Sequence, residues 1–223
     1  MLSLVKWEVE GVEFDAGVVE NDLERAIVYH IRYQEYAVHL QQVPAEDCPD
    51  EQEIDACDAH SCHLLVTMNG NPVGTIRNID VQKGFLLEQG TFGGQPYTWP
   101  TDPSDHLPLD RSRTVEVSRF VGRSQTLPSG TRVLLSQLLL EANMRWSQTV
   151  GVRHWICAFN AGVCDSFRRQ GWPFIDTIPG IHEYHGAKVY VCMLQIPRRD
   201  LFPVVRTLPP MRRATIPPLS ERA

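Results

Sequence analysis

One hairpin signal constrains the fold more than any other feature of the chain. Two apolar runs, His63–Met68 and Val73–Arg77, are separated by Asn69-Gly70-Asn71. An Asn-Gly pair supplies the positive φ angles that a tight turn between antiparallel strands needs. The chain should therefore contain an antiparallel pair of strands, around which its other segments are arranged.

The other segments alternate between strand-like and helix-like patterns. Loose alternation or short apolar runs predict four further strands, over residues 4–14, 114–121, 155–159 and 188–196. Apolar residues at helical spacing predict three helices, which begin near Leu23, near Arg132 and after Asn160. This order predicts a mixed α/β domain with helices packed on a central sheet.

Polar residues at the helix ends predict where the helices start and stop. Asn21 or Asp22 can cap the first helix, and Ser129 or Thr131 can cap the second. Gly171 is a natural end for the third. Residues 42–58 are acidic and contain two prolines, so they are interpreted as loop. Residues 83–113 show no periodicity, and a connection of that length is often a lid or a binding loop.

Composition places the chain among globular proteins. It has 223 residues, of which 43% are hydrophobic and 22% are charged. No apolar run approaches the roughly 18 residues of a membrane-spanning helix, and residues 1–8 lack the basic start and apolar stretch of a secretory signal. We therefore expect a cytoplasmic protein with no membrane span, in which the six cysteines are reduced.

Charge is distributed unevenly along the chain. The net charge of −6 argues against nucleic acid as the default partner. From Pro197 onward, however, six arginines face two acids, and six of the sixteen prolines lie there. We therefore separate a domain over residues 1–196 from a Pro/Arg-rich tail over residues 197–223, which we expect to be extended or disordered. A basic tail suits an acidic partner, although solvation alone explains many such runs.

Charged residues also stand where core residues are expected. Arg77 lies in an apolar strand, and Glu116 and Arg119 lie within another. Buried charges need partners, for which Asp55 and Asp58 are candidates. Glu116 and Arg119 point to opposite faces of a regular strand, so they can meet only if a bulge shifts the register. Two interpretations remain open: a structural ion network, and a network that shapes a pocket for an amine-bearing substrate.

Other motifs narrow the chemistry. The chain contains no Gly-x-Ser-x-Gly, no phosphate loop and no His-Glu-x-x-His, so many common enzyme classes are unsupported. The strand-to-helix step over residues 121–132 can present backbone N–H groups to a phosphate or a pantetheine amide. Cys57, His60, Cys62 and His63 suggest a metal site as an alternative, but their spacing fits no familiar zinc module.

Four motifs carry a resemblance to a known superfamily: Arg32–Tyr36, Glu53–Asp58, Gly74–Arg77 and Glu116–Phe120. Over residues 20–196 the chain resembles the acyl-homoserine-lactone (autoinducer) synthases and the long-chain N-acyl amino acid synthases, which share the GNAT fold. The resemblance implies an N-acyltransferase that moves a fatty acyl group from an acyl carrier protein or acyl-CoA thioester to an amine. The acceptor would be an amino acid or S-adenosylmethionine, and no cofactor would be tightly bound.

The resemblance also implies roles for individual residues. It implies that Glu116 and Arg119 are catalytic. Glu116 is the candidate base, and we expect Arg119 to hold it ionised and in place. The residues it implies for substrate binding are Arg32, Tyr36, Asp55, Asp58, Arg77, Ser118 and Phe120. The charged members of both groups would form an ion-pair cluster beside the amine pocket.

Two departures from the superfamily pattern bear on the substrates. Autoinducer synthases usually carry a tryptophan near the S-adenosylmethionine site, but residues 37–42 contain none, which favours a free amino acid. The loop after Phe120 lacks the usual GNAT Gln/Arg-x-x-Gly-x-Gly/Ala motif, which fits acyl carrier protein better than acetyl-CoA.

Further expectations concern the acyl chain and the carrier. The residues expected to line the acyl pocket are Leu134, Leu138, Trp146 and Phe159. The arginines on which an acidic carrier protein could dock are Arg123, Arg132, Arg145, Arg153, Arg168, Arg169 and those of the tail. The alternative function is a non-catalytic GNAT module that binds an acyl carrier.

Overall fold

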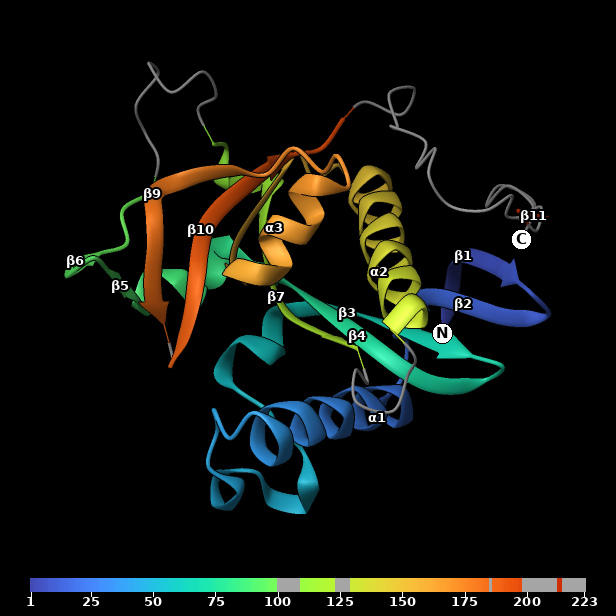
Figure 1. The fold of residues 1–223 in the computed structure, drawn as a ribbon. Coiled ribbons are helices and arrows are strands. Elements are labelled where there is room, and N and C mark those ends of the chain that lie inside the picture. The colour runs from blue at the N-terminus through green and yellow to red at the C-terminus, as the bar shows by residue number, and fades with distance from the viewer. Residues whose placement is uncertain (100–108, 123–128, 185, 198–211, 214–223) are drawn as a thin grey trace.

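The computed structural model describes residues 1–99, 109–122, 129–184, 186–197 and 212–213 (Figure 1). Its centre is a nine-stranded mixed sheet in the order β11-β1-β2-β3-β4-β7-β8-β10-β9. The strands of this sheet are β1 (Leu2–Val9), β2 (Val12–Val18), β3 (Ser61–Met68), β4 (Asn71–Asp80), β7 (Thr114–Gly122), β8 (His154–Asn160), β9 (Ile175–Tyr184), β10 (Ala187–Gln195) and β11 (Arg212–Arg213). A separate short hairpin consists of β5 (Thr91–Phe92) and β6 (Gln95–Pro96).

Three α-helices accompany the sheet in this part of the chain: α1 (Asp22–Tyr33), α2 (Ser129–Val150) and α3 (Ala161–Arg169). A π-helical segment, Gln34–His39, continues directly from α1. Short 3-10 turns occupy Ala45–Asp47, Pro49–Glu51, Ala56–His60, Val81–Lys83, Leu87–Gln89 and Arg111–Arg113. None of the described helices is long and apolar enough to cross a membrane.

The predicted hairpin is confirmed. β3 and β4 pair in antiparallel register, and Asn69 and Gly70 form the turn with φ angles of 49° and 78°. The strand predicted over residues 4–14 is wrong as a single strand, because Glu10 and Gly11 form a turn between β1 and β2. β9 was not predicted, since most of its residues are exposed or half-buried and its sequence carries no apolar alternation.

Two of the predicted helix caps are confirmed. The Asn21 side chain accepts a hydrogen bond from the Glu24 N–H at 2.9 Å, and the Asn160 side chain accepts one from the Gly162 N–H at 3.1 Å. The cap predicted at Ser129 or Thr131 is wrong, because both residues lie inside α2. Gly171 follows α3 with a φ of +89°, as a helix stop requires.

The helices lie on opposite faces of the sheet. Neighbouring residues of a strand point to opposite faces, and Ile76 packs in one core cluster with Leu135 of α2 and Phe167 of α3. On β3, Leu65 packs instead with Ile31 of α1. Figure 1 accordingly shows α2 and α3 beside each other and α1 apart from them. The sheet therefore has an α2/α3 face and an α1 face, and the second bears the buried charges described below.

The sheet parts between β7 and β8. These two strands are parallel and pair only from Thr114↔His154 to Glu116↔Ile156. β7 then continues to Gly122 and β8 to Asn160 without further pairing between them. Among the described residues, the edge of β7 beyond Glu116 therefore has no strand partner, at the centre of the sheet.

Candidate active site

A bulge in β7 sets the geometry of the site. Thr75 pairs with Val121 and Arg77 pairs with Ser118, so β7 holds one more residue than β4 over this stretch. Arg119 lies in the bulge with a φ of 48°, a left-handed conformation that costs a non-glycine residue about 1–3 kcal/mol. The register shift that the sequence demanded is thus present, and it brings Arg119 to the α1 face.

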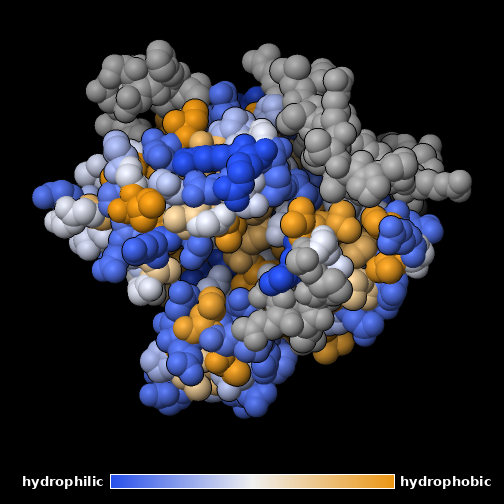
Figure 2. All heavy atoms as spheres, in the orientation of Figure 1, coloured by the Kyte–Doolittle hydropathy of each residue, from blue (hydrophilic) through white to orange (hydrophobic). Residues whose placement is uncertain are grey.

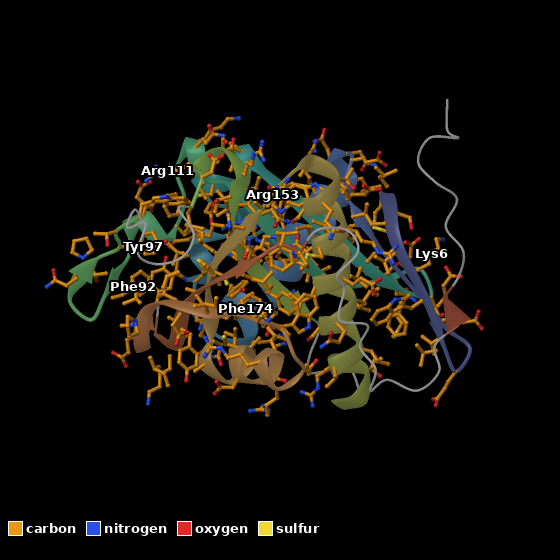
Figure 3. All side chains as sticks on the ribbon, turned by 90° about the horizontal axis from the view of Figure 1, so that it is seen from above. Lys6, Phe92, Tyr97, Arg111, Arg153 and Phe174 are labelled. Atoms are coloured by element: carbon orange, nitrogen blue, oxygen red, sulfur yellow. The ribbon has the colours of Figure 1, made fainter. Side chains whose placement is uncertain are left out.

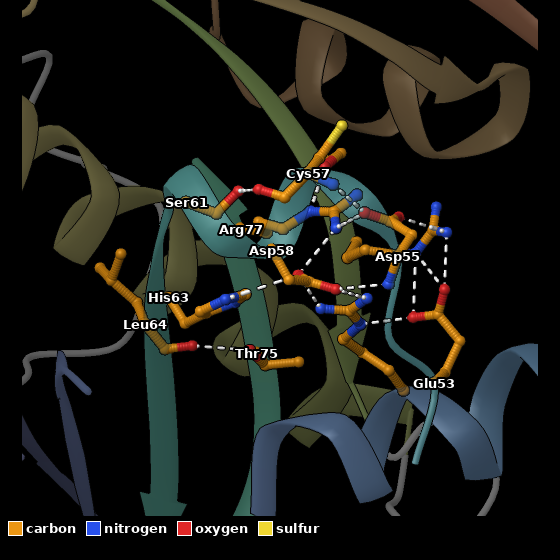
Figure 4. Close-up of polar contacts among 12 residues, drawn as sticks. Glu53, Asp55, Cys57, Asp58, Ser61, His63, Leu64, Thr75 and Arg77 are labelled. Carbon is orange, nitrogen blue, oxygen red and sulfur yellow. Dashed lines mark hydrogen bonds and ion pairs between the residues drawn. The ribbon is translucent and has the colours of Figure 1, made fainter. Parts of the chain in front are cut away.

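Six charged side chains on that face form a closed ring of alternating sign, which we call the ion ring: Arg32, Glu53, Arg119, Asp55, Arg77 and Asp58. Arg32 of α1 contacts Glu53 at 2.5 Å and Asp58 at 2.7 Å. Arg77 of β4 contacts Asp58 at 2.8 Å and Asp55 at 2.7 Å. Figure 4 shows the Asp55, Asp58 and Arg77 side chains pointing toward one another.

Arg119 closes the ring. Its guanidinium contacts Glu53 at 2.7 Å and Asp55 at 3.2 Å. The ring of Tyr36 lies 5.0 Å from this guanidinium, within cation–π range. Arg119 therefore ties the bulge of β7 to the π-helical segment and to the loop before β3.

The local fold explains why two of the acids converge. The Asp55 side chain accepts a hydrogen bond from the Cys57 N–H at 2.9 Å and caps the turn Ala56–His60. The Asp58 side chain accepts one from the Asp55 N–H at 2.7 Å, completing a capping box. This turn leaves further carboxylate lone pairs for Arg32 and Arg77.

Burial makes the ion ring a structural element. The Arg32 and Arg77 side chains are 0% exposed, whereas those of Asp55 and Arg119 are 24% and 20% exposed. Burial alone would raise the pKa of Glu53, but the hydrogen bond from Arg119 and the charge of Arg32 outweigh it, so that pKa is lowered. Burial would also raise the pKa of Asp58, but the hydrogen bond from Arg32 and the charge of Arg32 outweigh it, so that pKa is lowered too. Only Asp55 and Arg119 are accessible enough for a substrate to contact.

Glu116 lies beside the ring rather than in it. Its side chain is buried, and its Oε2 accepts a hydrogen bond from the Leu87 N–H at 3.0 Å. Burial raises the pKa of Glu116 to about 7, against the opposing effects of the Leu87 N–H and the Arg77 charge. Sequence reasoning expected Arg119 to hold Glu116 in place. The hydrogen bonds of Arg119 go instead to Glu53 and Asp55, so the Leu87 backbone takes that role.

Sequence reasoning missed Glu53 as a site residue. Glu53 precedes Asp55 and Asp58 in an acidic segment that was interpreted as loop. Its spacing from those two acids was the available signal, since it is the third carboxylate that the three clustered arginines need. The expected pairing of Arg77 with Asp55 and Asp58 is confirmed, and this network is common to both interpretations of the charges.

The remaining predicted residues divide between the two faces. Ser118 contacts the ion ring, because its Oγ accepts a hydrogen bond from Arg77 Nε at 3.0 Å. Phe120 faces away from the ring and packs against Phe159 and Phe167, at ring distances of 5.9 and 5.5 Å. Phe120 and Phe159 thus meet where β7 and β8 part.

The four residues expected to line an acyl pocket pack in or against one core cluster. Leu138 and Phe159 are buried, and Leu134 and Trp146 are half-buried against the same core cluster. Figure 2 shows apolar side chains in a hollow near the middle of the face that is turned toward the viewer. Residues 123–128, with Arg123, lie outside the described residues, as do Arg198, Arg199, Arg206 and Arg222 of the tail.

The metal alternative finds no support in the described residues, where no group of His, Cys, Asp and Glu is arranged to hold a metal ion. Cys62 and His63 are neighbours on β3, so they point to opposite faces. His60 Nε2 instead lies 2.8 Å from the Gly84 carbonyl oxygen. Burial and the Arg32 charge lower the pKa of His63 to about 4, so its imidazole is neutral beside the ion ring. All six cysteines are free.

Comparisons with known proteins point to one fold. Residues 31–127, which include every member of the ion ring and Glu116, match the family model described as an acetyltransferase (GNAT) domain. No curated protein sequence matches the chain.

Several solved structures have a similar fold. The CoA-dependent acyl-homoserine lactone synthase MesI is 18% identical, with a TM-score of 0.60 over 82% of this chain and 89% of that chain. The AHL synthase LasI is 20% identical, with a TM-score of 0.58 over 83% and 90%. BjaI, a CoA-dependent acyl-homoserine lactone synthase with SAM and isopentyl-CoA, is 16% identical, with a TM-score of 0.56 over 82% and 83%. The chain therefore has the GNAT fold, of the form found in acyl-homoserine lactone synthases.

Proposed function

We propose that the chain is an N-acyltransferase that moves a fatty acyl group from an acyl carrier protein or acyl-CoA thioester to the amine of an amino acid or of S-adenosylmethionine. The observation that carries the proposal is Glu116, a buried carboxyl group with a pKa raised to about 7 at the point where β7 and β8 part. A general base works best when its pKa lies near the operating pH.

The reaction needs one proton acceptor and one polarised carbonyl. The acceptor arrives as an ammonium ion, and Glu116 removes one proton. The freed nitrogen lone pair attacks the thioester carbonyl carbon, forming a C–N bond and a tetrahedral oxyanion. The C–S bond then breaks as the carbonyl re-forms, the nitrogen loses its second proton, and the sulfur leaves as a thiol.

The free edge of β7 supports the oxyanion step. Beyond Glu116 this edge has no strand partner, so its backbone N–H groups can donate to the oxyanion. One such donor contributes about 3–4 kcal/mol in enzymes where it has been removed. The apolar contacts of Phe120 and Phe159 beside this edge suit an acyl chain.

The ion ring supports recognition of a charged acceptor. Asp55 and Arg119 are its partly exposed members, and Tyr36 lies against Arg119. We assign Asp55 to the ammonium group of the acceptor and Arg119 to a carboxylate. Arg32, Asp58, Arg77 and Ser118 hold these two groups in place, and Phe120 borders the acyl chain.

BjaI was solved with SAM and isopentyl-CoA, which supports S-adenosylmethionine as the acceptor and an acyl-CoA as the donor. The absence of tryptophan over residues 37–42 favours a free amino acid for this chain. The missing GNAT loop motif favours acyl carrier protein as donor. These are choices within one reaction class.

One experiment separates the possibilities. Purified protein is offered decanoyl-carrier protein or decanoyl-CoA, with S-adenosylmethionine or each of the twenty amino acids, and products are identified by mass spectrometry while thiol release is followed. We expect an N-acyl product that is absent when Glu116→Gln replaces the wild type. A carrier protein that binds without thiol release for any acceptor would contradict the proposal and favour a non-catalytic acyl-carrier-binding module.

A further inference from the structure

An aromatic layer covers the sheet next to Glu116. Its members, which we call the aromatic cap, are Phe85, Phe92, Tyr97 and Trp99. The Tyr97 ring makes edge contacts with Phe85 at 5.9 Å and with Phe92 at 6.3 Å. Figure 3 shows Phe92 and Tyr97 close together beside the β5–β6 hairpin. The cap is built from the long connection between β4 and β7.

Tyr97 carries a hydroxyl group that the packing of the cap does not require. The residue is 7% exposed, and its hydroxyl oxygen is buried with no hydrogen-bond partner among the described residues. Leaving such a group unpaired is unfavourable, because it has lost its hydrogen bonds to water. Phe85 and Phe92 fill the same cluster without a hydroxyl. The Tyr184 hydroxyl, in contrast, donates to the Leu86 carbonyl at 3.1 Å.

The Tyr97 ring packs in the cluster that flanks Glu116. Glu116 pairs with Ile79 on one side and Ile156 on the other, and both of these residues belong to the cluster that contains Tyr97. Leu87, whose N–H binds the Glu116 carboxylate, is a further member. Burial raises the pKa of Tyr97, and the Glu116 charge raises it further. Tyr97 and Glu116 are thus both in contact with the same group of buried residues.

We propose that the Tyr97 hydroxyl and the Glu116 carboxyl group form one two-point subsite that holds the reacting nitrogen through two N–H bonds and thereby selects primary amines. This inference rests on the proposed function and adds to it a residue that determines acceptor specificity.

The proton count explains the selectivity. After Glu116 has taken one proton from the ammonium group, a primary amine keeps two N–H groups and a lone pair. One N–H donates to Glu116 and the other to the Tyr97 oxygen, which directs the lone pair at the thioester carbonyl. An N-methyl amine keeps only one N–H. Its methyl group would face the Tyr97 oxygen and leave that oxygen buried and unpaired, as it is without substrate.

Acceptor discrimination tests the subsite. The ratio of kcat/KM for the best primary amine acceptor to that for its N-methyl derivative is measured in wild type, Tyr97→Phe and Tyr184→Phe. We expect Tyr97→Phe to reduce this ratio about 10-fold, because the N-methyl group then faces an apolar ring. Tyr184→Phe removes a paired hydroxyl from a ring that contacts the cap and should leave the ratio within about 2-fold of wild type. An unchanged ratio in Tyr97→Phe overturns the inference.

A binding measurement keeps the inference testable if no acceptor turns over. The Glu116 side-chain carboxyl carbon is followed by ¹³C NMR at pH 8 during titration with propylammonium and with N,N-dimethylpropylammonium, which has a single N–H. We expect wild type to bind propylammonium more tightly and Tyr97→Phe to lose that preference. Preference without turnover refutes the proposed function and retains the subsite. Equal binding by wild type refutes the subsite, and this comparison needs no folded variant.

Discussion

Glu116 combines two properties that rarely coexist, because it is buried and yet no cationic side chain of the described residues is bonded to it. Its carboxylate accepts a backbone N–H, while the nearby arginines are bonded to other acids. The desolvation of the carboxylate therefore dominates and raises its pKa to about 7. A base that releases its proton near neutral pH can be reused at each turnover.

The raised pKa predicts how stability depends on pH. Between the ordinary pKa of 4.5 and the folded value of about 7, the folded chain holds a proton that the unfolded chain has released. Folding stability therefore falls as pH rises through this window. Glu116→Gln should raise the unfolding free energy at pH 8 by on the order of 3 kcal/mol and have little effect below pH 4. Urea unfolding at the two pH values measures this difference. Equal effects at both would mean that the carboxylate is not desolvated.

Asp55 is the partly exposed acid of the ion ring. Asp55→Asn keeps the cap on the turn before β3 but removes the charge that we assign to the acceptor ammonium. We expect KM for the acceptor to rise about 10-fold or more, with KM for the acyl donor unchanged. Asp80→Asn, which alters a more exposed acid, serves as the control. A parallel rise in both KM values would indicate a general loss of structure instead.

At the scale of elements, the ion ring joins α1, the loop before β3, β4 and β7. Arg77 is fully buried and bonds to two acids, so its removal leaves those acids uncompensated. We expect Arg77→Ala to lower the unfolding free energy by about 3–5 kcal/mol, measured by urea denaturation. Arg153→Ala, an exposed change, should alter it by about 0.5 kcal/mol or less. If Arg77→Ala unfolds like wild type, the ring does not hold these elements together.

The exposed ends of α2 and α3 predict where an acidic carrier docks. Arg132 near the start of α2 and Arg169 at the end of α3 are exposed. We expect Arg132→Glu and Arg169→Glu to raise KM for decanoyl-carrier protein severalfold and to leave KM for decanoyl-CoA unchanged. The effect should shrink as salt is added, because exposed charges are screened. An equal change for both donors would place the carrier elsewhere.

The elements that sequence reasoning predicted were those with local signals. The β3–β4 hairpin had its Asn-Gly turn, and α1 and α3 had side-chain caps. β9 had no such signal, because it is held by pairing with β10 while most of its side chains remain at least partly exposed. The start of α2 was misplaced because Ser129 and Thr131 are common cap residues that here lie inside the helix.

At the scale of the whole molecule, the site exists because distant segments meet. Pairing Arg77 with Asp55 and Asp58 could be inferred from the cost of buried charge, and the bulge at Arg119 from the odd spacing to Glu116. The closure of the ring by Glu53 and the binding of Glu116 to Leu87 depend on tertiary geometry. The aromatic cap depends on it as well, since its connection carries no periodicity. Such contacts are not encoded in the spacing of any one segment.

The proposed role of Glu116 as a base, at the point where β7 and β8 part, belongs to this scale. Its most direct test is the pH dependence of amide formation from decanoyl thioester, compared between wild type and Glu116→Gln from pH 5 to 9. We expect wild-type kcat/KM to rise with pH to a plateau above about pH 7. Glu116→Gln should be about 10²–10⁴-fold slower and should lack that transition. A folded Glu116→Gln protein with the rate and pH profile of wild type would contradict the account.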